Sequence, residues 1–267
     1  MILDFVGMSY NSGRDELFLA DGNNKVVRAM RLRDNAGDLH EVYRPPHDTS
    51  TFLLLKSVCH MSDSDTLLMC SGEEGLNRSW LVALSRNSSE WREAQRVQTD
   101  GEEWISCALS DSQVLIGVFR SRYMELFYVD SGPRIASLHL IHVPERYDWF
   151  SATCGSDTPV AMSYSYSNHL VRVHWLRGDR LEELARIQLK RPDRLLWLAD
   201  RLLVADFDEN NKSHAVIELE VSDTRFKRRR ELIATSENIR VRSLCAVNDG
   251  LAIFDYNTDN ILHYSFV

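Results

Sequence analysis

Residues 195–207 read LLWLADRLLVADF, which is an apolar strand, a turn containing Asp200 and a second apolar strand. Asp suits such turns because its carboxylate accepts hydrogen bonds from nearby backbone amides. The pattern occurs five more times, as MSYNSGRDELFLAD (8–21), SVCHMSDSDTLLMC (57–70), ISCALSDSQVLIGVF (105–119), SATCGSDTPVAMSY (151–164) and SLCAVNDGLAIFDY (243–256). Six copies of one unit in 267 residues indicate a repeat protein.

The spacing of these units predicts the architecture. The second strands begin near residues 16, 66, 113, 159, 201 and 250, so the steps are 50, 47, 46, 42 and 49 residues. A period of this size filled with short strands is typical of a β-propeller. Each unit continues with an alternating third strand, such as SHAVIELEV (213–221), and a more polar fourth strand, such as FKRRRELIAT (226–235). We therefore predict an all-β, six-bladed β-propeller.

The ends of the chain predict an incomplete last blade. The first unit begins directly with its first strand and the sixth ends with its third, which leaves 6 × 4 − 1 = 23 strands. We expect one propeller domain over 1–267, with blades of about 1–46, 47–100, 101–144, 145–190, 191–238 and 239–267. The outer edge of the last strand carries no Lys, Arg, Asp or Glu to discourage pairing with another strand. We predict an open edge there, with the residues Ile261, His263, Ser265 and Val267. A segment from outside residues 1–267, of the same full-length chain or of a partner, should cover this edge in antiparallel orientation. The alternative is that residues 1–3 leave the first blade and cover it.

Composition narrows the class of protein. Hydrophobic residues make up 44% and charged residues 26% of the chain, as in globular proteins that do not cross a membrane. No apolar run is long enough for a transmembrane helix, and the N-terminus does not resemble a signal peptide. Five cysteines without CxxC spacing favour thiols packed between blades over a metal ring or a disulfide framework. We expect an intracellular protein, although sequons at Asn77, Asn87 and Asn211 leave secretion open.

Two stretches resemble a known repeat family. DELFLADGNNKVVRAMRL (15–32) is similar to the core of NHL repeats, in which a strand ends in Ala-Asp before an Asn-rich turn and a Val-rich strand. RLLVADFDENNK (201–212) shows the same features. The resemblance implies a six-bladed propeller that binds protein or RNA. Related six-bladed folds hydrolyse lactones and esters with a central calcium, which keeps an enzyme among the alternatives.

The loops at one mouth of the channel suggest a partner surface. These loops hold eight basic and thirteen acidic residues by our boundaries, a net charge of 8 − 13 = −5, which disfavours nucleic acid. Aromatic anchors beside acidic residues suit a basic or amphipathic peptide. The candidate contacts are Trp104, Trp149, Trp197, Glu102 and Glu103. The alternative role for the three tryptophans is to wedge neighbouring blades together.

One basic run stands apart from this acidic surface. It consists of Arg225, Lys227, Arg228, Arg229 and Arg230. It can serve as a nuclear-import signal or an anion contact, or it can be the solvated outer strand of the fifth blade.

No motif indicates catalysis. GxSxG and HExxH are absent, and the nine histidines are scattered along the chain. We therefore predict no catalytic residues, metal or cofactor, and a protein-binding platform within a larger chain or complex. The alternatives are a propeller hydrolase with a channel metal and an RNA-binding NHL-type module.

Overall fold

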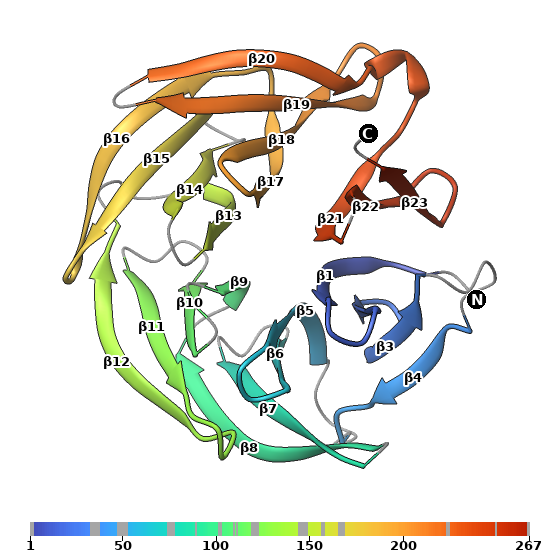
Figure 1. Ribbon diagram of the computed structural model, residues 1–267, viewed down its shortest axis with the longest axis vertical. Coiled ribbons are helices and arrows are strands. Elements are labelled where there is room, and N and C mark those ends of the chain that lie inside the picture. Colours follow the sequence, from blue (N-terminus) through green and yellow to red (C-terminus); the bar gives the residue numbers. More distant parts are fainter. Residues whose placement is uncertain are drawn as a thin grey trace.

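The blades form a ring around a central channel in the computed structural model (Figure 1). It describes residues 3–32, 38–46, 53–73, 78–88, 90–100, 103–108, 110, 112–118, 123–143, 149–155, 158–164, 169–222, 225–248 and 250–265. Every regular element in these ranges is a β-strand except one 3-10 turn, Thr235–Glu237. The predicted all-β, six-bladed fold is confirmed, and within the described residues the last blade has three strands.

Each blade is an antiparallel meander that runs from the channel outward (Figure 1). The strands nearest the channel are β1 (Phe5–Asn11), β5 (Leu53–Met61), β9 (Glu103–Ala108), β13 (Trp149–Gly155), β17 (Pro192–Leu198) and β21 (Val241–Val247). The second strands are β2 (Glu16–Asp21), β6 (Thr66–Glu73), β10 (Gln113–Val118), β14 (Thr158–Tyr164), β18 (Arg201–Asp208) and β22 (Gly250–Asp255).

The third and fourth strands complete the blades. The third strands are β3 (Val26–Arg31), β7 (Arg78–Asn87), β11 (Tyr123–Val129), β15 (Leu170–Arg177), β19 (Ser213–Ser222) and β23 (Asn260–Ser265). The fourth strands are β4 (His40–Tyr43), β8 (Glu90–Asp100), β12 (Ile135–His142), β16 (Arg180–Gln188) and β20 (Arg225–Ile233). These are 23 strands within the described residues, the number expected from the repeat.

The core is a ring of six apolar layers, each between two neighbouring blades. Successive side chains of a strand point to opposite faces, so the second strands feed two layers at once. In β2, Phe18 and Ala20 pack toward the second blade, whereas Leu17 and Leu19 pack toward the sixth. All six residues of β2 and of β22 are buried. The near-continuous apolar runs of the second strands follow from this burial on both faces.

The first and sixth blades meet at a seam that closes the ring. Phe5 and Phe254 lie in contact there, with their ring centroids 4.8 Å apart. Arg242 donates from Nε to Asp4 Oδ1 at 2.7 Å and from Nη2 to Oδ2 at 2.9 Å. The Ser243 hydroxyl donates to the Phe5 carbonyl at 2.6 Å. Residues 238 positions apart therefore join the two ends of the ring without sharing a sheet.

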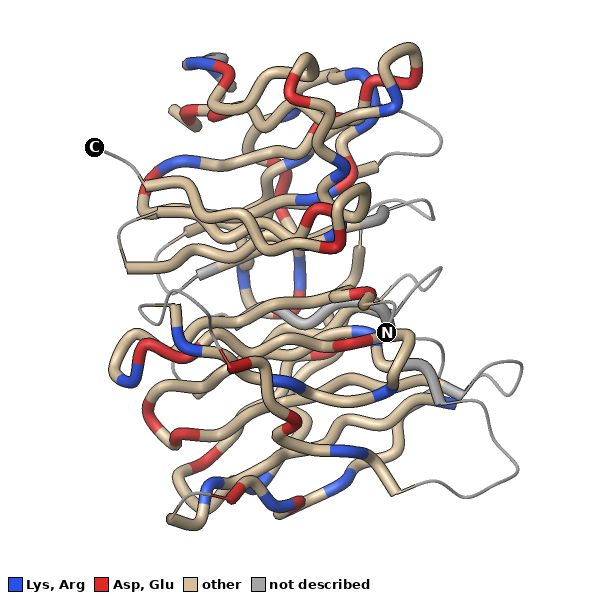
Figure 2. Tube along the Cα trace, turned by 90° about the vertical axis from the view of Figure 1, so that its right-hand side faces the viewer, with Lys and Arg blue, Asp and Glu red and all other residues tan. Residues whose placement is uncertain are grey.

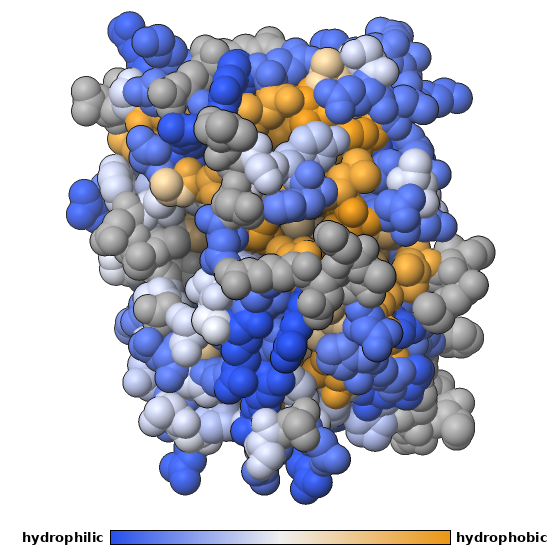
Figure 3. Space-filling view, turned by 45° about the vertical axis from the view of Figure 1, so that its right-hand side comes forward, coloured by the Kyte–Doolittle hydropathy of each residue, from blue (hydrophilic) through white to orange (hydrophobic). Residues whose placement is uncertain are grey.

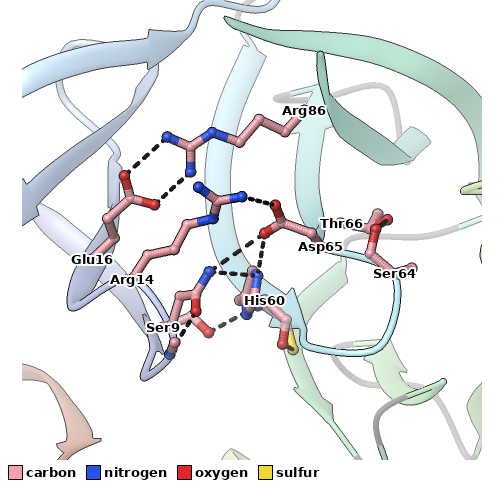
Figure 4. A network of polar contacts seen from close by, with 11 residues as sticks. Ser9, Arg14, Glu16, His60, Ser64, Asp65, Thr66 and Arg86 are labelled. Carbon is pink, nitrogen blue, oxygen red and sulfur yellow. Dashed lines mark hydrogen bonds and ion pairs between the residues drawn. The ribbon is translucent and has the colours of Figure 1, made fainter. Parts of the chain in front are cut away.

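A polar network joins the first and second blades (Figure 4). Arg86 makes a two-pronged contact with Glu16, at 2.6 and 3.1 Å. Asp65 lies 3.3 Å from Arg14 and 3.1 Å from His60. This network adds to the apolar layer beneath it, which contains Phe18.

One contact between blades was not expected from the sequence. His142 of β12 pairs in parallel with Arg180 of β16, and the His142 amide donates to the Asp179 carbonyl at 3.1 Å. The third and fourth blades are thereby joined at their outer strands into one eight-stranded sheet.

Candidate functional site: a basic channel mouth

The central channel contains a cavity of about 970 Å³. The first strands of five blades contribute its described lining, because those strands face the axis of the ring. Its charged lining residues are Asp4, Lys56, Arg191, Asp193, Arg194, Arg240 and Arg242. Most of these lie just before or at the start of a first strand, which is the end of the channel where consecutive blades are connected.

Arg191 and Arg240 occupy equivalent places at the mouth and are held in the same way. The Arg191 amide donates to Asp206 Oδ1 at 2.7 Å, and the Arg240 amide donates to Asp255 Oδ1 at 2.8 Å. Each guanidinium lies over the aromatic ring of the residue that directly follows this Asp. The Arg191 guanidinium carbon is 5.2 Å from the centroid of the Phe207 ring, and the Arg240 guanidinium carbon is 5.3 Å from the centroid of the Tyr256 ring. A buried carboxylate thus holds the backbone, and a cation–π contact orients the charged group.

Arg194 links the fifth and sixth blades inside the mouth. Its Nε donates to the Arg242 carbonyl at 2.7 Å, so part of its donor fork is held against the backbone of the next blade. Arg242 in turn is neutralised by Asp4 of the first blade. Arginine residues of the fifth and sixth blades and a carboxylate of the first blade therefore form one connected cluster.

The second carboxylate in the lining, Asp193, has its position set by His214. The Val241 amide donates to His214 Nδ1 at 3.1 Å, so this nitrogen must accept and the ring proton of neutral His214 resides on Nε2. Nε2 lies 3.2 Å from Asp193 Oδ2 and donates to it. Asp193 also lies 3.5 Å from Arg191 Nε.

The described lining is positive although the chain is negative. Five Lys and Arg residues stand against two Asp residues, a balance of 5 − 2 = +3, whereas the whole chain carries −8. The sequence had led us to expect an acidic loop face, but much of that acidity belongs to residues such as Glu74, Glu102 and Glu145, which lie outside the described residues. Figure 2 shows acidic and basic residues interspersed along the chain, so the net charge does not predict the sign at the mouth.

Sequence reasoning missed Arg194, Arg240 and Arg242 as channel residues. A signal was present, since Arg240 and Arg242 are two positions apart and residues at that spacing share one face of a strand. We had counted only the loops, whereas the first residues of the inner strands also line the mouth.

Three thiols line the deeper channel, at Cys59, Cys154 and Cys245. Burial, with a smaller effect of nearby Cys59, raises the pKa of the Cys245 thiol to about 12, so it stays protonated at neutral pH. Among the described residues, no three His, Cys, Asp or Glu side chains are grouped so as to hold a metal ion.

Of the predicted aromatic contacts, only Trp197 has a described side chain. It is 9% exposed, and its indole donates to the Pro159 carbonyl of the preceding blade at 2.8 Å. This is the wedging position that we had considered as the alternative. Trp104, Glu103 and Trp149 lie in strands β9 and β13, but their side chains, like all of Glu102, fall outside the description.

The predicted basic run lies on β20, the outermost strand of the fifth blade. Arg225, Lys227 and Arg230 are exposed there, and Arg230 Nε lies 3.4 Å from the buried carboxylate of Glu218. For Arg228 and Arg229 only the backbone is described. The run is separate from the channel lining.

The predicted edge residues lie on the outermost strand of the sixth blade. Ile261, His263 and Ser265 belong to β23, which has β22 as its only neighbour in the described sheet. Val267 is outside the described residues.

Comparison with known proteins shows the fold but no family. No protein-family model and no curated protein sequence matches the chain. Among solved structures, a chain of the mitotic checkpoint complex matches with a TM-score of 0.67 at 10% identity, over 99% of this chain and 90% of that one. A chain of a nidogen/laminin complex gives 0.66 at 12% identity, over 94% and 88%. Virginiamycin B lyase from Staphylococcus aureus gives 0.60 at 11% identity, over 100% and 96%.

These similar structures are β-propellers, and their titles include protein complexes as well as an enzyme. At such low identity the similarity establishes the architecture alone. The propeller part of the resemblance is thereby confirmed, whereas membership of the NHL group is not shown. The described residues contain no helix that is long and apolar enough to cross a membrane. The chain therefore shares the β-propeller fold with these known structures.

Proposed function

We propose that this propeller is a protein-binding platform whose sixth blade accepts a strand from another polypeptide. The observation that carries the proposal is the difference between the blades. The other five contain a fourth strand antiparallel to the third, while β23 ends the described sixth sheet. A strand added to β23 completes the four-stranded pattern and pairs its outward backbone groups.

The side chains of β23 suit such an addition. Leu262 and Tyr264 are half-buried and pack toward the fifth blade, whereas Ile261 packs toward the first. A fourth strand with apolar residues on both of its faces would extend the apolar layer next to the fifth blade and the one next to the first blade. Figure 3 brings the side of the first and sixth blades forward and shows hydrophobic residues at the surface among hydrophilic ones. We therefore assign the partner as an extended segment rich in β-branched or aromatic residues, antiparallel to β23.

The other edges explain why β23 is the favoured place. The fourth strands β8, β16 and β20 each carry several charged residues, which oppose the addition of a further strand. The fourth strand β12 carries none, but it is joined to β16 within the eight-stranded sheet. Residues 260–265 of β23, NILHYS, contain no Lys, Arg, Asp or Glu. Strand addition at β23 therefore meets no charged side chain from that strand.

Amide hydrogen exchange tests the proposal in two steps. In the isolated chain, the outward amides of Ile261 and Ser265 should exchange fast, while those of β22 are protected. Adding the partner, identified by crosslinking in the native source, should slow exchange at 260–265 and leave β20 unchanged. Ser265→Pro, which removes an edge amide, should weaken that protection, and Ser222→Pro on the fifth blade serves as the control. Full protection of 260–265 in the isolated chain contradicts the proposal.

The two alternative functions suggested by the sequence, a hydrolase and an RNA-binding module, can be tested separately. Turnover of an ester or lactone together with calcium-dependent stabilisation would favour the hydrolase. Binding of RNA with a steep salt dependence that is lost in Lys227→Gln would favour the RNA-binding module.

A further inference from the structure

We propose that the basic channel mouth binds a small anion that carries two or more phosphate or carboxylate groups. This site is distinct from the β23 edge, and the inference does not depend on the proposed protein-binding function. It rests on the charge, the geometry and the size of the mouth.

The charge of the lining favours an anion. The two carboxylates in its described part already face cations or a donor, since Asp4 pairs with Arg242 and Asp193 contacts Arg191 and His214. Arg240 has no carboxylate partner among the described residues, and its side chain is exposed at the mouth. With Lys56 and Arg194 counted, and with Glu209, which lies 3.6 Å from Arg191, set against them, the described residues of the mouth carry an excess of 5 − 3 = +2 charges. A ligand with a single negative charge neutralises only part of this excess, so a multiply charged ligand fits better.

The geometry shows that these cations are held in place before a ligand arrives. Arg191 and Arg240 are fixed by the same pair of contacts, an amide bonded to a second-strand Asp and a guanidinium over an aromatic ring. Arg194 is anchored on the Arg242 carbonyl at 2.7 Å. Binding therefore orders few additional side chains, which lowers the entropic cost of association. Guanidinium groups also offer paired N–H donors that match carboxylate and phosphate oxygens.

The size of the cavity favours a small ligand over a nucleic acid. Its volume of about 970 Å³ is within the range of small-molecule sites in proteins, roughly 300–1,000 Å³. The cations line this cavity instead of forming a stripe along the outer surface. The exposed basic run on β20 is the competing anion site, and it provides the matched control.

Isothermal titration calorimetry with inorganic triphosphate and with citrate tests the inference. The full chain should bind at least one of the two at a single site, and the stronger of them identifies phosphate or carboxylate as the preferred group. Arg240→Gln should weaken binding by about tenfold, as expected for loss of a charge-assisted contact. Arg194→Gln should act in the same direction. Lys227→Gln removes one positive charge from the basic run and should leave the affinity within about twofold, which is less than a neutral contact contributes.

Thermal unfolding of each variant separates lost binding from lost folding, because Arg240 takes no part in an ion pair of the seam. An equal loss in Lys227→Gln and Arg240→Gln would place the anion on β20 and overturn the inference. Saturable binding of neither anion, or binding only of an acidic peptide such as hexaglutamate, would overturn it as well.

Discussion

The first blade has two neighbours, and it contacts them in different ways. Against the second blade it combines an apolar layer with a buried polar network around Glu16, Arg86 and His60. Against the sixth blade it relies on the packing of Phe5 and Phe254, with one more exposed ion pair between Arg242 and Asp4. The first two blades are also consecutive in the chain, whereas the seam joins its two ends. We infer that the seam is the place where the ring opens most easily.

Removing apolar packing from the seam should have the largest effect. Phe254 is fully buried, so Phe254→Ala should lower the free energy of unfolding by about 3–5 kcal/mol. Phe18→Ala, at a fully buried site facing the second blade, is the matched control. Urea unfolding measures both. Hydrogen exchange should increase locally in β1 and β21 for Phe254→Ala, because Phe254 packs against Phe5 in the layer between these blades. A uniform increase over all six blades would contradict the idea of a weak seam.

Breaking the buried ion pair of the other interface should cost somewhat less. The side chains of Arg86 and Glu16 are 15% and 7% exposed. Glu16→Gln removes the carboxylate that pairs with Arg86 and leaves a largely buried charge without a partner. We expect the free energy of unfolding to fall by about 3 kcal/mol. Chemical denaturation of the single variants and of Glu16→Gln with Arg86→Met separates the pair interaction from the cost of an unpaired charge. A double variant no more stable than Glu16→Gln would argue against this explanation.

Acidification should weaken the polar network and the fourth blade while sparing the seam. Burial lowers the pKa of His60 despite the opposing effect of Asp65, and burial lowers the pKa of His174 in the fourth blade to about 4. A histidine whose pKa is lower in the folded than in the unfolded chain destabilises the fold as pH falls below its unfolded value of about 6.5. His174 should therefore cost about 2 kcal/mol between pH 6.5 and 5.

Urea unfolding from pH 7 to 5 measures this loss. His174→Leu should remove the larger part of the pH dependence, and His60→Gln a further part. Phe254→Ala should keep the pH dependence of the parent protein. An unchanged slope in both histidine variants would assign the loss to other groups.

The smallest effect is expected for the ion pair of the seam. Arg242→Gln removes the same two-pronged geometry that Arg86 makes with Glu16, but the Arg242 side chain is 36% exposed. Solvent screens the interaction, so we expect a loss of about 1 kcal/mol. Thermal or urea unfolding beside Glu16→Gln gives the comparison directly. Equal losses at the two sites would show that burial does not govern the difference between the interfaces.

The repeat could be recognised in the sequence because it depends on residues that lie close together in the chain. Apolar second strands such as residues 201–208, followed by turns rich in Asp and Asn, recur at intervals of 42–50 residues. Asp208 shows the reason, because it accepts hydrogen bonds from the amides of Asn210 and Asn211 within its own turn. Such contacts span few residues and leave a pattern that can be read along the chain.

The sequence by itself determined the strands, their order and the number of blades, since these depend on alternation and turn residues close together in the chain. Only the tertiary structure decided which side chains meet across blades. Arg194 reaches the carbonyl of Arg242, 48 positions away, and Phe5 meets Phe254 across the closed ring. The positive balance of the described channel lining in a negative chain has the same origin, because ring closure gathers the first residues of separate inner strands around one axis. The charge near that axis depends on which residues the fold brings together there, and this cannot be read from the composition of the chain.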